Sequence, residues 1–213
     1  MAEYGGEDKE LWLTETGWHE SLVNEQNAGM TVTEHDKAYY IARALLQNDA
    51  GKFYDRIYFY EFVNSGIEWS YGEARYGTLQ SNFDAIPYGA RPAYVATAAA
   101  NWMLGGAEFK DTIDGPKVDL RAGTYVYRWT RPNNDGWGDQ FIGLWTSQVR
   151  KNVSLDLGVD EAILVDMYGN AKPMKAVNGV FNFMLSEEPQ YLVGDFTKFE
   201  KAEATVKSSE HPY

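Results

Sequence analysis

The chain has 213 residues, enough for one large domain or two small ones. Hydrophobic residues make up 44% and charged residues 23%, values typical of a folded protein rather than a disordered one. The absence of cysteine excludes disulfides, thiolate metal sites and a cysteine nucleophile. Lysine and arginine total 19 against 31 acidic residues, a net charge of −12, so we expect no nucleic-acid partner.

The apolar runs are far too short for a membrane span, so no membrane partner is expected either. The first ten residues, MAEYGGEDKE, are polar and acidic and show no signal peptide. The sequence therefore does not decide the cellular compartment of the protein, because these residues contain no recognisable targeting segment.

Up to about residue 105 the sequence alternates strand and helix patterns. Residues 11–13 form a short apolar strand pattern, and residues 56–63 form a continuous apolar and aromatic run. A run of that length is typical of a parallel strand buried on both faces. One predicted helix precedes this run, and another extends from about Pro92 to the glycine pair at 105–106. The order β-α-β-α predicts a parallel sheet with helical crossovers.

The first of these helices has clear boundaries. Thr33, followed three residues later by Asp36, is close to a capping box. Apolar residues at helical spacing follow, at positions 38, 41, 42, 45 and 46, and Gly51 is a suitable stop.

Beyond residue 106 short alternating strands recur at the spacing of a β-sandwich. We expect them at residues 124–130, 140–146, 152–157, 162–167, 180–185 and 190–193. Asn178-Gly179 is the favoured two-residue hairpin turn. The predicted fold class is α/β plus all-β, with an α/β part at 1–105, an antiparallel sandwich at 106–195 and an unassigned or disordered polar tail at 196–213.

Glu15 is the strongest candidate for chemistry. It lies where the first apolar strand gives way to Thr-Gly-Trp, so its carboxylate projects from the carboxyl end of that strand. Active sites of α/β folds lie at this end. Gly17 permits a sharp exit, and Trp18 places an indole beside the carboxylate, as a sugar site requires. The alternative is that Glu15 only accepts hydrogen bonds at a strand end.

The second strand brings further side chains to the same rim. Tyr60 would stack on a sugar ring, and Glu61 and Asn64 would bind its hydroxyls. Trp69 would extend an aromatic cleft. The alternative is that Tyr60 packs in the core, that Asn64 forms a turn and that Trp69 packs over the strand.

Other chemistries find little support in the sequence. No second ligand completes a metal site at His19, so we expect no metal, and His19 instead approaches the Glu15 rim. There is no serine elbow, phosphate-binding loop or dinucleotide fingerprint, so no cofactor is expected.

Five segments follow one another along the first half: LWLTETGW, TVTEHDKAYYIARALLQ, RIYFYEFVNSG, YGTL and RPAYVATAAANWML. Together they resemble the last two βα units of clan A glycoside hydrolases, near families 39 and 5. Residues 152–194 resemble the β-sandwich that follows the barrel in many of these enzymes. The resemblance implies a partial (β/α)8 barrel of two βα units followed by an antiparallel β-sandwich. It assigns Glu15 as the retaining nucleophile, Tyr60 as an aromatic of the −1 subsite and a poly- or oligosaccharide as the substrate.

The resemblance is incomplete in one respect. Retaining hydrolysis needs a second carboxyl group as acid/base, and the Asn-Glu-Pro-like run that carries it in the family is absent. We therefore predict a C-terminal fragment that is inactive alone. Two βα units leave an apolar strand edge exposed. Either the missing N-terminal barrel portion covers it from another chain, or the chain self-associates, or the fold is marginal.

A second function remains open, a noncatalytic carbohydrate-binding or interaction module with a vestigial barrel segment. Trp129, Trp137 and Trp145 would form its aromatic platform, although the alternation of the strands favours the core for Trp129 and Trp145. For a carbohydrate-degrading protein we expect a secreted, periplasmic or cell-surface location, with a cytoplasmic one as the alternative.

Overall fold

A computed structural model describes residues 5–6, 8–20, 32–114, 123–148 and 150–201. The chain divides into two compact units. The first comprises Met1–Gly106 together with the turn Met167–Asn170, and the second comprises Ala107–Asp166 and Ala171–Tyr213. No helix among the described residues is long and apolar enough to cross a membrane.

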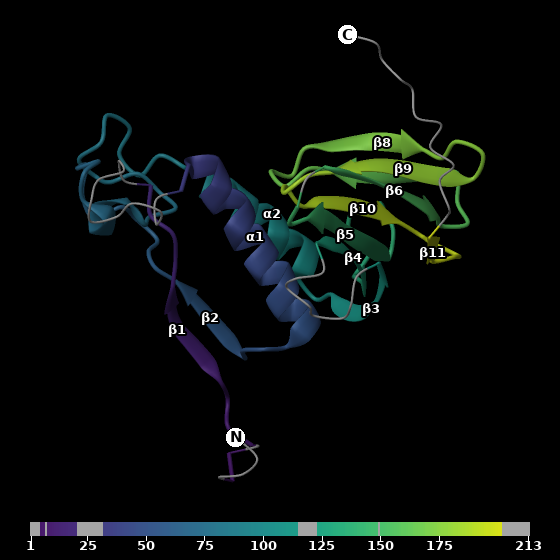
Figure 1. Ribbon diagram of the computed structural model, residues 1–213, viewed down its shortest axis with the longest axis horizontal. Helices are drawn as coiled ribbons and strands as arrows, with labels where there is room; N and C mark the ends of the chain where they lie inside the picture. The colour runs from purple at the N-terminus through teal and green to yellow at the C-terminus, as the bar shows by residue number, and fades with distance from the viewer. Residues whose placement is uncertain (1–4, 7, 21–31, 115–122, 149, 202–213) are drawn as a thin grey trace. The chain divides into compact units, whose positions relative to one another are not determined.

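The first unit has the predicted order of strand, helix, strand and helix (Figure 1). Its elements are β1 (Trp12–Thr16), α1 (Glu34–Gly51), β2 (Arg56–Phe59), the 3-10 helix η2 (Gly72–Arg75) and α2 (Pro92–Leu104). β1 and β2 are parallel, with Leu13 opposite Ile57, which confirms the predicted parallel pairing with a helical crossover.

Local signals in the sequence explain where α1 begins and ends. The Thr33 hydroxyl accepts the N–H of Asp36 at 3.0 Å, and the Asp36 carboxylate accepts the N–H of Thr33 at 3.0 Å. This reciprocal pair is the predicted capping box. The helix ends at Gly51, and Lys52 follows in the left-handed conformation with its N–H bonded to the Asn48 carbonyl oxygen.

Small side chains let α1 and α2 pack closely. Ala38 and Ala42 of α1 and Ala93, Ala96 and Ala100 of α2 are all 0% exposed and belong to one hydrophobic cluster. Alanine brings two helix backbones near to each other at little cost in side-chain entropy. The two helices form the packed core of this unit.

The second predicted strand is shorter and more exposed than the sequence suggested. β2 ends at Phe59 instead of residue 63, and Arg56 and Tyr58 are exposed, so the predicted burial on both faces is wrong for the described residues. The apolar residues beyond it pair differently. The N–H of Leu79 donates to the Phe62 oxygen at 2.9 Å, and the N–H of Asn64 donates to the Leu79 oxygen at 3.0 Å.

The second unit is an antiparallel β-sandwich. Its strands are β3 (Glu108–Asp114), β4 (Thr124–Thr130), β5 (Gln140–Thr146), β6 (Lys151–Asp156), β7 (Glu161–Val165), β8 (Ala171–Lys175), β9 (Val180–Leu185), β10 (Gln190–Gly194) and β11 (Glu200–Lys201). They form a sheet of order β3-β4-β5-β10-β7-β8 and a sheet of order β11-β6-β9. One hydrophobic core draws side chains from both sheets, among them Ile142, Leu155 and Phe181. All six predicted strands are present, whereas β3, β8 and β11 were missed.

Two details of the sandwich match the sequence. Asn178 and Gly179 have φ angles of 53° and 78°, as a two-residue hairpin turn requires. Trp129 and Trp145 are 0% exposed, which confirms their prediction as core residues. Each stacks on a cross-strand partner, Phe141 for Trp129 and Tyr125 for Trp145. Of the predicted tail, residues 200–201 pair with β6, and residues 202–213 lie outside the described residues.

Candidate functional site

The carboxyl ends of β1 and β2 lie side by side. Glu15 is the last residue but one of β1 and is exposed, and Tyr60 directly follows β2. The N–H of Tyr60 donates to the Thr16 carbonyl oxygen at 2.7 Å. The two strongest candidates from the sequence thus come from neighbouring strand ends of one parallel sheet, the edge where α/β folds place their reacting groups.

Gly17 makes this close approach possible. A Cβ atom at Gly17 would collide with the carbonyl oxygen of Tyr60 and come within 3.1 Å of the Tyr76 ring. Only glycine fits where two backbones meet so closely. The sharp exit predicted from this glycine is therefore also a packing requirement of the rim.

Aromatic rings form one wall beside Glu15. The Tyr60 and Tyr76 rings meet edge-on with centroids 5.2 Å apart, and His19 meets Tyr76 edge-on at 5.2 Å. Tyr76 was missed in the sequence because it lies in a loop with no periodic signal. Edge-on contacts of this kind add a modest attraction to the burial of the rings.

Three carboxylates surround the two phenols. Negative charge on Glu61 raises the pKa of Tyr60 most strongly, followed by burial and by the charges of Glu73 and Glu15. Burial raises the pKa of Tyr76, and the charges of Glu73 and Glu15 add to the effect. Both phenols therefore keep their protons at neutral pH, and a hydrogen bond between Tyr60 and Glu73 adds to the rise in the pKa of Tyr60. Glu73, on η2, is a second residue that the sequence reasoning missed.

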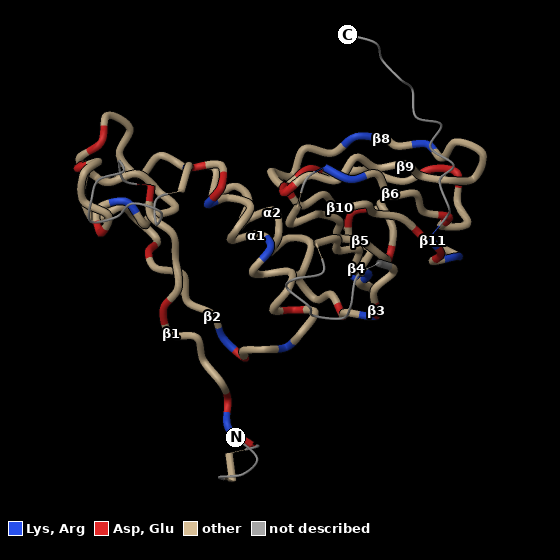
Figure 2. The backbone as a smooth tube through the Cα atoms, in the orientation of Figure 1, with Lys and Arg blue, Asp and Glu red and all other residues tan. Residues whose placement is uncertain are grey.

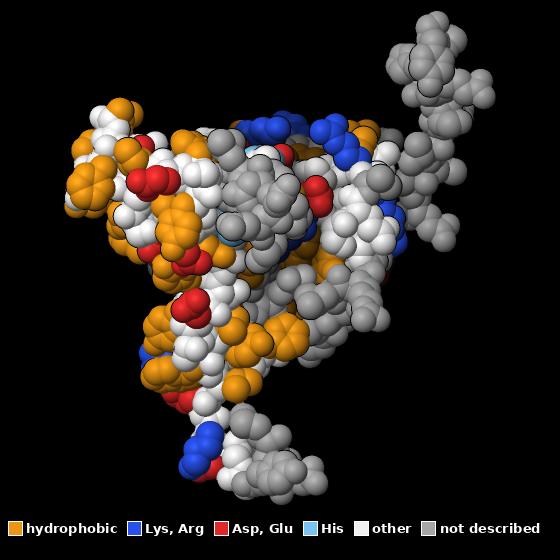
Figure 3. Space-filling view, turned by 60° about the vertical axis from the view of Figure 1, so that its left-hand side comes forward, with side chains coloured by type: hydrophobic (Ala, Val, Ile, Leu, Met, Phe, Trp, Pro, Cys, Tyr) orange, Lys and Arg blue, Asp and Glu red, His pale blue; other side chains and the backbone are white. Residues whose placement is uncertain are grey.

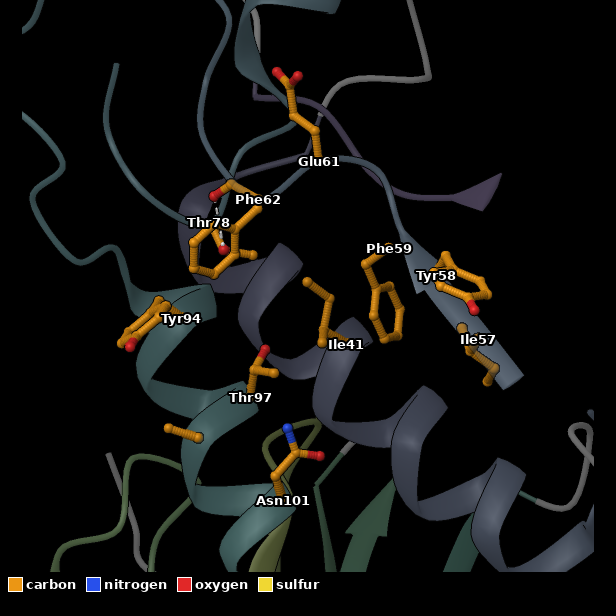
Figure 4. A pocket seen from close by; sticks show the side chains of 11 residues that line it. Ile41, Ile57, Tyr58, Phe59, Glu61, Phe62, Thr78, Tyr94, Thr97 and Asn101 are labelled. Carbon is orange, nitrogen blue, oxygen red and sulfur yellow. Dashed lines mark hydrogen bonds between the residues drawn. The ribbon is translucent and has the colours of Figure 1, made fainter. Parts of the chain in front are cut away.

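Glu61 occupies a less solvated position than Glu15. Its burial raises its pKa, and the nearby charge of Glu73 acts in the same direction. The N–H of Ser65 donates to Glu61 Oε1 at 2.9 Å and partly offsets that rise. In Figure 4 the Glu61 side chain points away from the groups around Ile41 and Thr97.

Two predicted substrate-binding residues are buried instead of facing the rim. Asn64 is 2% exposed, and its Oδ1 accepts the N–H of Gly77 at 2.7 Å. His19 is 4% exposed, and its ring lies 3.3 Å from the position of a Cβ on Gly72. Both side chains shape the loops behind the rim, and a sugar hydroxyl does not reach them in this conformation.

The predicted tryptophans differ in exposure. Trp18 is half-buried, and its ring lies 5.3 Å from that of Tyr40 on α1. Trp69 is 47% exposed, and the guanidinium of Arg75 lies 3.6 Å from the ring centroid. The cation over the ring attracts it and favours this orientation of the exposed indole. Of these two tryptophans, Trp69 is the one whose ring is accessible to a ligand.

A buried lysine holds the loop that carries Tyr76. Lys37 of α1 is 0% exposed, and its Nζ donates to the carbonyl oxygens of Arg75, Tyr76 and Gly77 at 3.3, 2.9 and 2.8 Å. The same Nζ lies 3.0 Å from Glu20 Oε1. Burial lowers the pKa of Lys37 to about 7. The free-energy cost of desolvating the amino group is offset because it donates hydrogen bonds to several backbone oxygens at once.

Glu20 joins this lysine to the start of α2. Its Oε2 pairs with Arg91, which also pairs with Glu34 of α1 at 2.5 Å. Both Glu20 and Arg91 have side chains that are 2% exposed. Burial lowers the pKa of Arg91 to about 10, so the guanidinium stays charged at neutral pH. The segment that follows Glu15 is thereby tied to both helices.

Acidification tests the burial of His19. Burial lowers the pKa of His19, and in the unfolded chain this group titrates near its ordinary value of about 6.5. The unfolded state then binds more protons below that pH, so stability falls as the pH drops. We expect the stability advantage of the wild type over His19→Asn to shrink between about pH 7.5 and 5.5. Hydrogen exchange of α1 measures this difference in stability between the two proteins. A difference that does not change with pH would refute the burial of His19.

No group of three or more histidine and acidic residues that would hold a metal ion occurs among the described residues. The rim presents carboxylates, phenols and aromatic faces. These are the groups with which proteins bind sugars and stabilise a positive anomeric centre.

The structure resembles that of a family 39 glycoside hydrolase from the gut symbiont Bacteroides cellulosilyticus WH2. The TM-score is 0.68 at 25% sequence identity, over 87% of this chain and 34% of that chain. The chain thus spans about a third of the length of that protein.

A conserved exported protein from Bacteroides fragilis shares the fold, with a TM-score of 0.51 at 15% identity over 88% of this chain and 39% of that one. No protein-family model matches the sequence, and no curated protein matches it. The predicted resemblance to a family 39 glycoside hydrolase is confirmed at the level of the structure.

Proposed function

We propose that the chain is the C-terminal part of a retaining glycoside hydrolase and that Glu15 is its nucleophile. The similarity to a family 39 hydrolase supports the class of reaction. The position of Glu15, exposed at a parallel strand end beside Tyr60, carries the assignment of the residue. In this proposal residues 1–105 are two βα units of a (β/α)8 barrel, and the sandwich is an accessory domain.

Each residue of the rim has a role in the proposed reaction. Glu15 attacks the anomeric carbon and forms a glycosyl ester, and a second carboxyl group protonates the leaving oxygen and then activates water. The phenol of Tyr60 donates a hydrogen bond to Glu73, and the phenol of Tyr76 stays protonated beside Glu73 and Glu15. Glu61 accepts a sugar hydroxyl, and Trp69 offers an apolar face to a further ring.

The substrate is a neutral or weakly charged poly- or oligosaccharide in this proposal. A net charge of −12 disfavours an anionic polymer, because the field of the whole molecule repels it. We propose an exported location, in keeping with the substrate, and a relative in fold is itself described as an exported protein.

The 213-residue chain alone is expected to be inactive on glycosides. Retaining hydrolysis needs a second carboxyl group about 5–5.5 Å from the nucleophile, and the proposal places that group outside these residues. The test is turnover of a panel of chromogenic aryl glycosides by the purified chain. Turnover that Glu15→Gln abolishes would contradict the need for a second part.

The burial of two tryptophans weakens the alternative function, a noncatalytic carbohydrate-binding module. Trp129 and Trp145 are 0% exposed, so they offer no platform to a polysaccharide, and Trp137 is half-buried. Affinity electrophoresis in polysaccharide gels separates the two functions. Retardation of the chain that Trp69→Ala leaves unchanged would revive the binding module, because the sandwich would then hold the sugar.

A further inference from the structure

A surface loop formed by residues 81–89 precedes α2. Its two ends meet, because the N–H of Gln80 donates to the Gly89 carbonyl oxygen at 2.9 Å. The residue before it, Leu79, donates its N–H to the Phe62 oxygen at 2.9 Å, just beyond the end of β2. The 81–89 loop is therefore anchored at the strand end where the rim lies.

Hydrogen bonds inside the 81–89 loop hold its shape. The N–H of Ser81 donates to Asp84 Oδ2 at 3.1 Å, and the N–H of Phe83 donates to Ser81 Oγ at 3.2 Å. The N–H of Gly89 donates to the Ile86 carbonyl oxygen at 3.0 Å. Compact loops whose ends lie close together are frequently functional. This loop thus presents its outer side chains from a fixed backbone.

These outer side chains are large and apolar. Phe83 and Ile86 are 72% and 67% exposed, the highest values for large hydrophobic side chains among the described residues, and Tyr88 is 58% exposed. Tyr88 also has a φ angle of 57°, in the left-handed region that bulky residues rarely adopt. Its ring gains little burial in return for this conformation. Residues of this kind cluster at ligand-binding positions.

The 81–89 loop continues the aromatic surface that begins at Trp69. Burial lowers the pKa of Arg75, and the negative charge of Asp84 partly offsets this effect, so Asp84 lies within electrostatic reach of the guanidinium. The same guanidinium lies 3.6 Å from the centroid of the Trp69 ring. Arg75 thus links the loop to Trp69. Figure 3 shows orange hydrophobic side chains beside red acidic ones on the face of the first unit that it brings forward.

The charges near these rings indicate the class of ligand. Between residues 57 and 90 the acidic residues Glu61, Glu68, Glu73 and Asp84 accompany one basic residue, Arg75. Figure 2 shows more red than blue along the loops of this region. A surface for anionic lipids would instead be rich in lysine and arginine. Aromatic rings beside carboxylates suit a neutral sugar, because its C–H face packs on a ring and its hydroxyls donate to carboxylates.

We infer that Trp69, Phe83 and Tyr88 form a distal surface for a neutral polysaccharide, which binds there the sugar units beyond the one held at Glu15. Phe83 and Tyr88 stack on sugar rings, and Asp84 accepts a hydroxyl. Because the 81–89 loop is already ordered, binding costs little conformational entropy. The inference rests on the proposed function and extends it, since it makes the substrate a polymer of several sugar units rather than a small glycoside.

Affinity electrophoresis tests the distal surface without catalysis. The 213-residue chain is run through gels that contain a β-glucan, a xylan, a mannan or an arabinan, and its retardation gives a Kd. We expect retardation by at least one polysaccharide. Phe83→Ala should raise that Kd about 3–10-fold, because one ring contact is lost. Tyr88→Asn should have a similar effect, and asparagine tolerates the left-handed conformation, so the loop keeps its fold.

Phe53→Ala is the matched control. Phe53 is 40% exposed and precedes β2, at the opposite end of the strand from the rim, so the Kd should not change. In the complete protein, Phe83→Ala should raise the KM for the polysaccharide about 3–10-fold. The kcat/KM for an aryl monoglycoside should stay the same, because a monoglycoside occupies only the site at Glu15.

The contrary outcomes are distinct for the two proposals. Absence of retardation by all four polysaccharides, or retardation that Phe83→Ala and Tyr88→Asn leave unchanged, would refute the distal surface. Binding that depends on both rings, in a complete protein that hydrolyses no glycoside, would uphold the distal surface and refute the proposed function. Hydrolysis that depends on Glu15, with the KM for the polysaccharide unchanged in Phe83→Ala, would uphold the proposed function and refute the distal surface.

Discussion

Replacing Lys37 by methionine is expected to destabilise the first unit by about 3–5 kcal/mol. Methionine has a similar length but donates no hydrogen bond, so the carbonyl oxygens of Arg75, Tyr76 and Gly77 lose their buried donor. Glu20 loses one of its two cationic partners at the same time. The cost arises from buried polar groups left without partners rather than from the loss of a charge.

Hydrogen exchange with mass spectrometry is the suitable measurement, because it reports each unit separately. Exchange in α1 and in the loop at 75–77 should accelerate in the variant, whereas exchange in β4 and β5 should not change. Lys52→Met is the matched control, since Lys52 follows the same helix and its side chain is 69% exposed. Equal effects of the two substitutions would show that Lys37 does not hold the loop.

Glu15→Gln is expected to reduce turnover by about 10⁴-fold or more in a protein that also supplies the second carboxyl group. Glutamine keeps the shape of the side chain but cannot form the glycosyl ester. The protein required is the product of the whole reading frame that contains these 213 residues. Initial rates on an aryl glycoside measure the effect.

Two further experiments test whether the effect is specific to the nucleophile. Glu10→Gln alters a carboxylate before the opposite end of β1, where Glu10 accepts from Trp12 Nε1, and should retain near-normal turnover. Azide added to Glu15→Ala should restore cleavage and yield a glycosyl azide of inverted configuration, since azide attacks in place of the missing carboxylate. Hydrolysis by Glu15→Gln at the wild-type rate would refute the assignment of Glu15 as the nucleophile.

Local patterns made much of the fold predictable. The capping box at Thr33 and Asp36 depends only on residues three apart, and the structure reproduces it with both hydrogen bonds. The six predicted strands of the sandwich all contribute apolar side chains to one core. The strand end that carries Glu15 was predictable for the same reason, because it follows a short apolar run.

Features that depend on distant partners were not predictable. β2 ends at Phe59 although the apolar run continues, because the residues after it bond to the segment around Leu79. Lys37 looks like a solvated charge on a helix, yet its acceptors lie in a loop 38–40 residues away. Tyr76 and Glu73 belong to the same loop region. Because a loop has no periodic pattern, its sequence does not predict where these side chains point.

Covalent trapping tests the central assignment most directly. The complete protein is incubated with an activated 2-deoxy-2-fluoroglycoside, which reacts with a retaining nucleophile and slows the second step. Digestion and mass spectrometry then identify the modified residue. The account predicts a fluoroglycosyl ester on Glu15. A label on a different carboxylate in an active enzyme, with Glu15 unmodified, would contradict it.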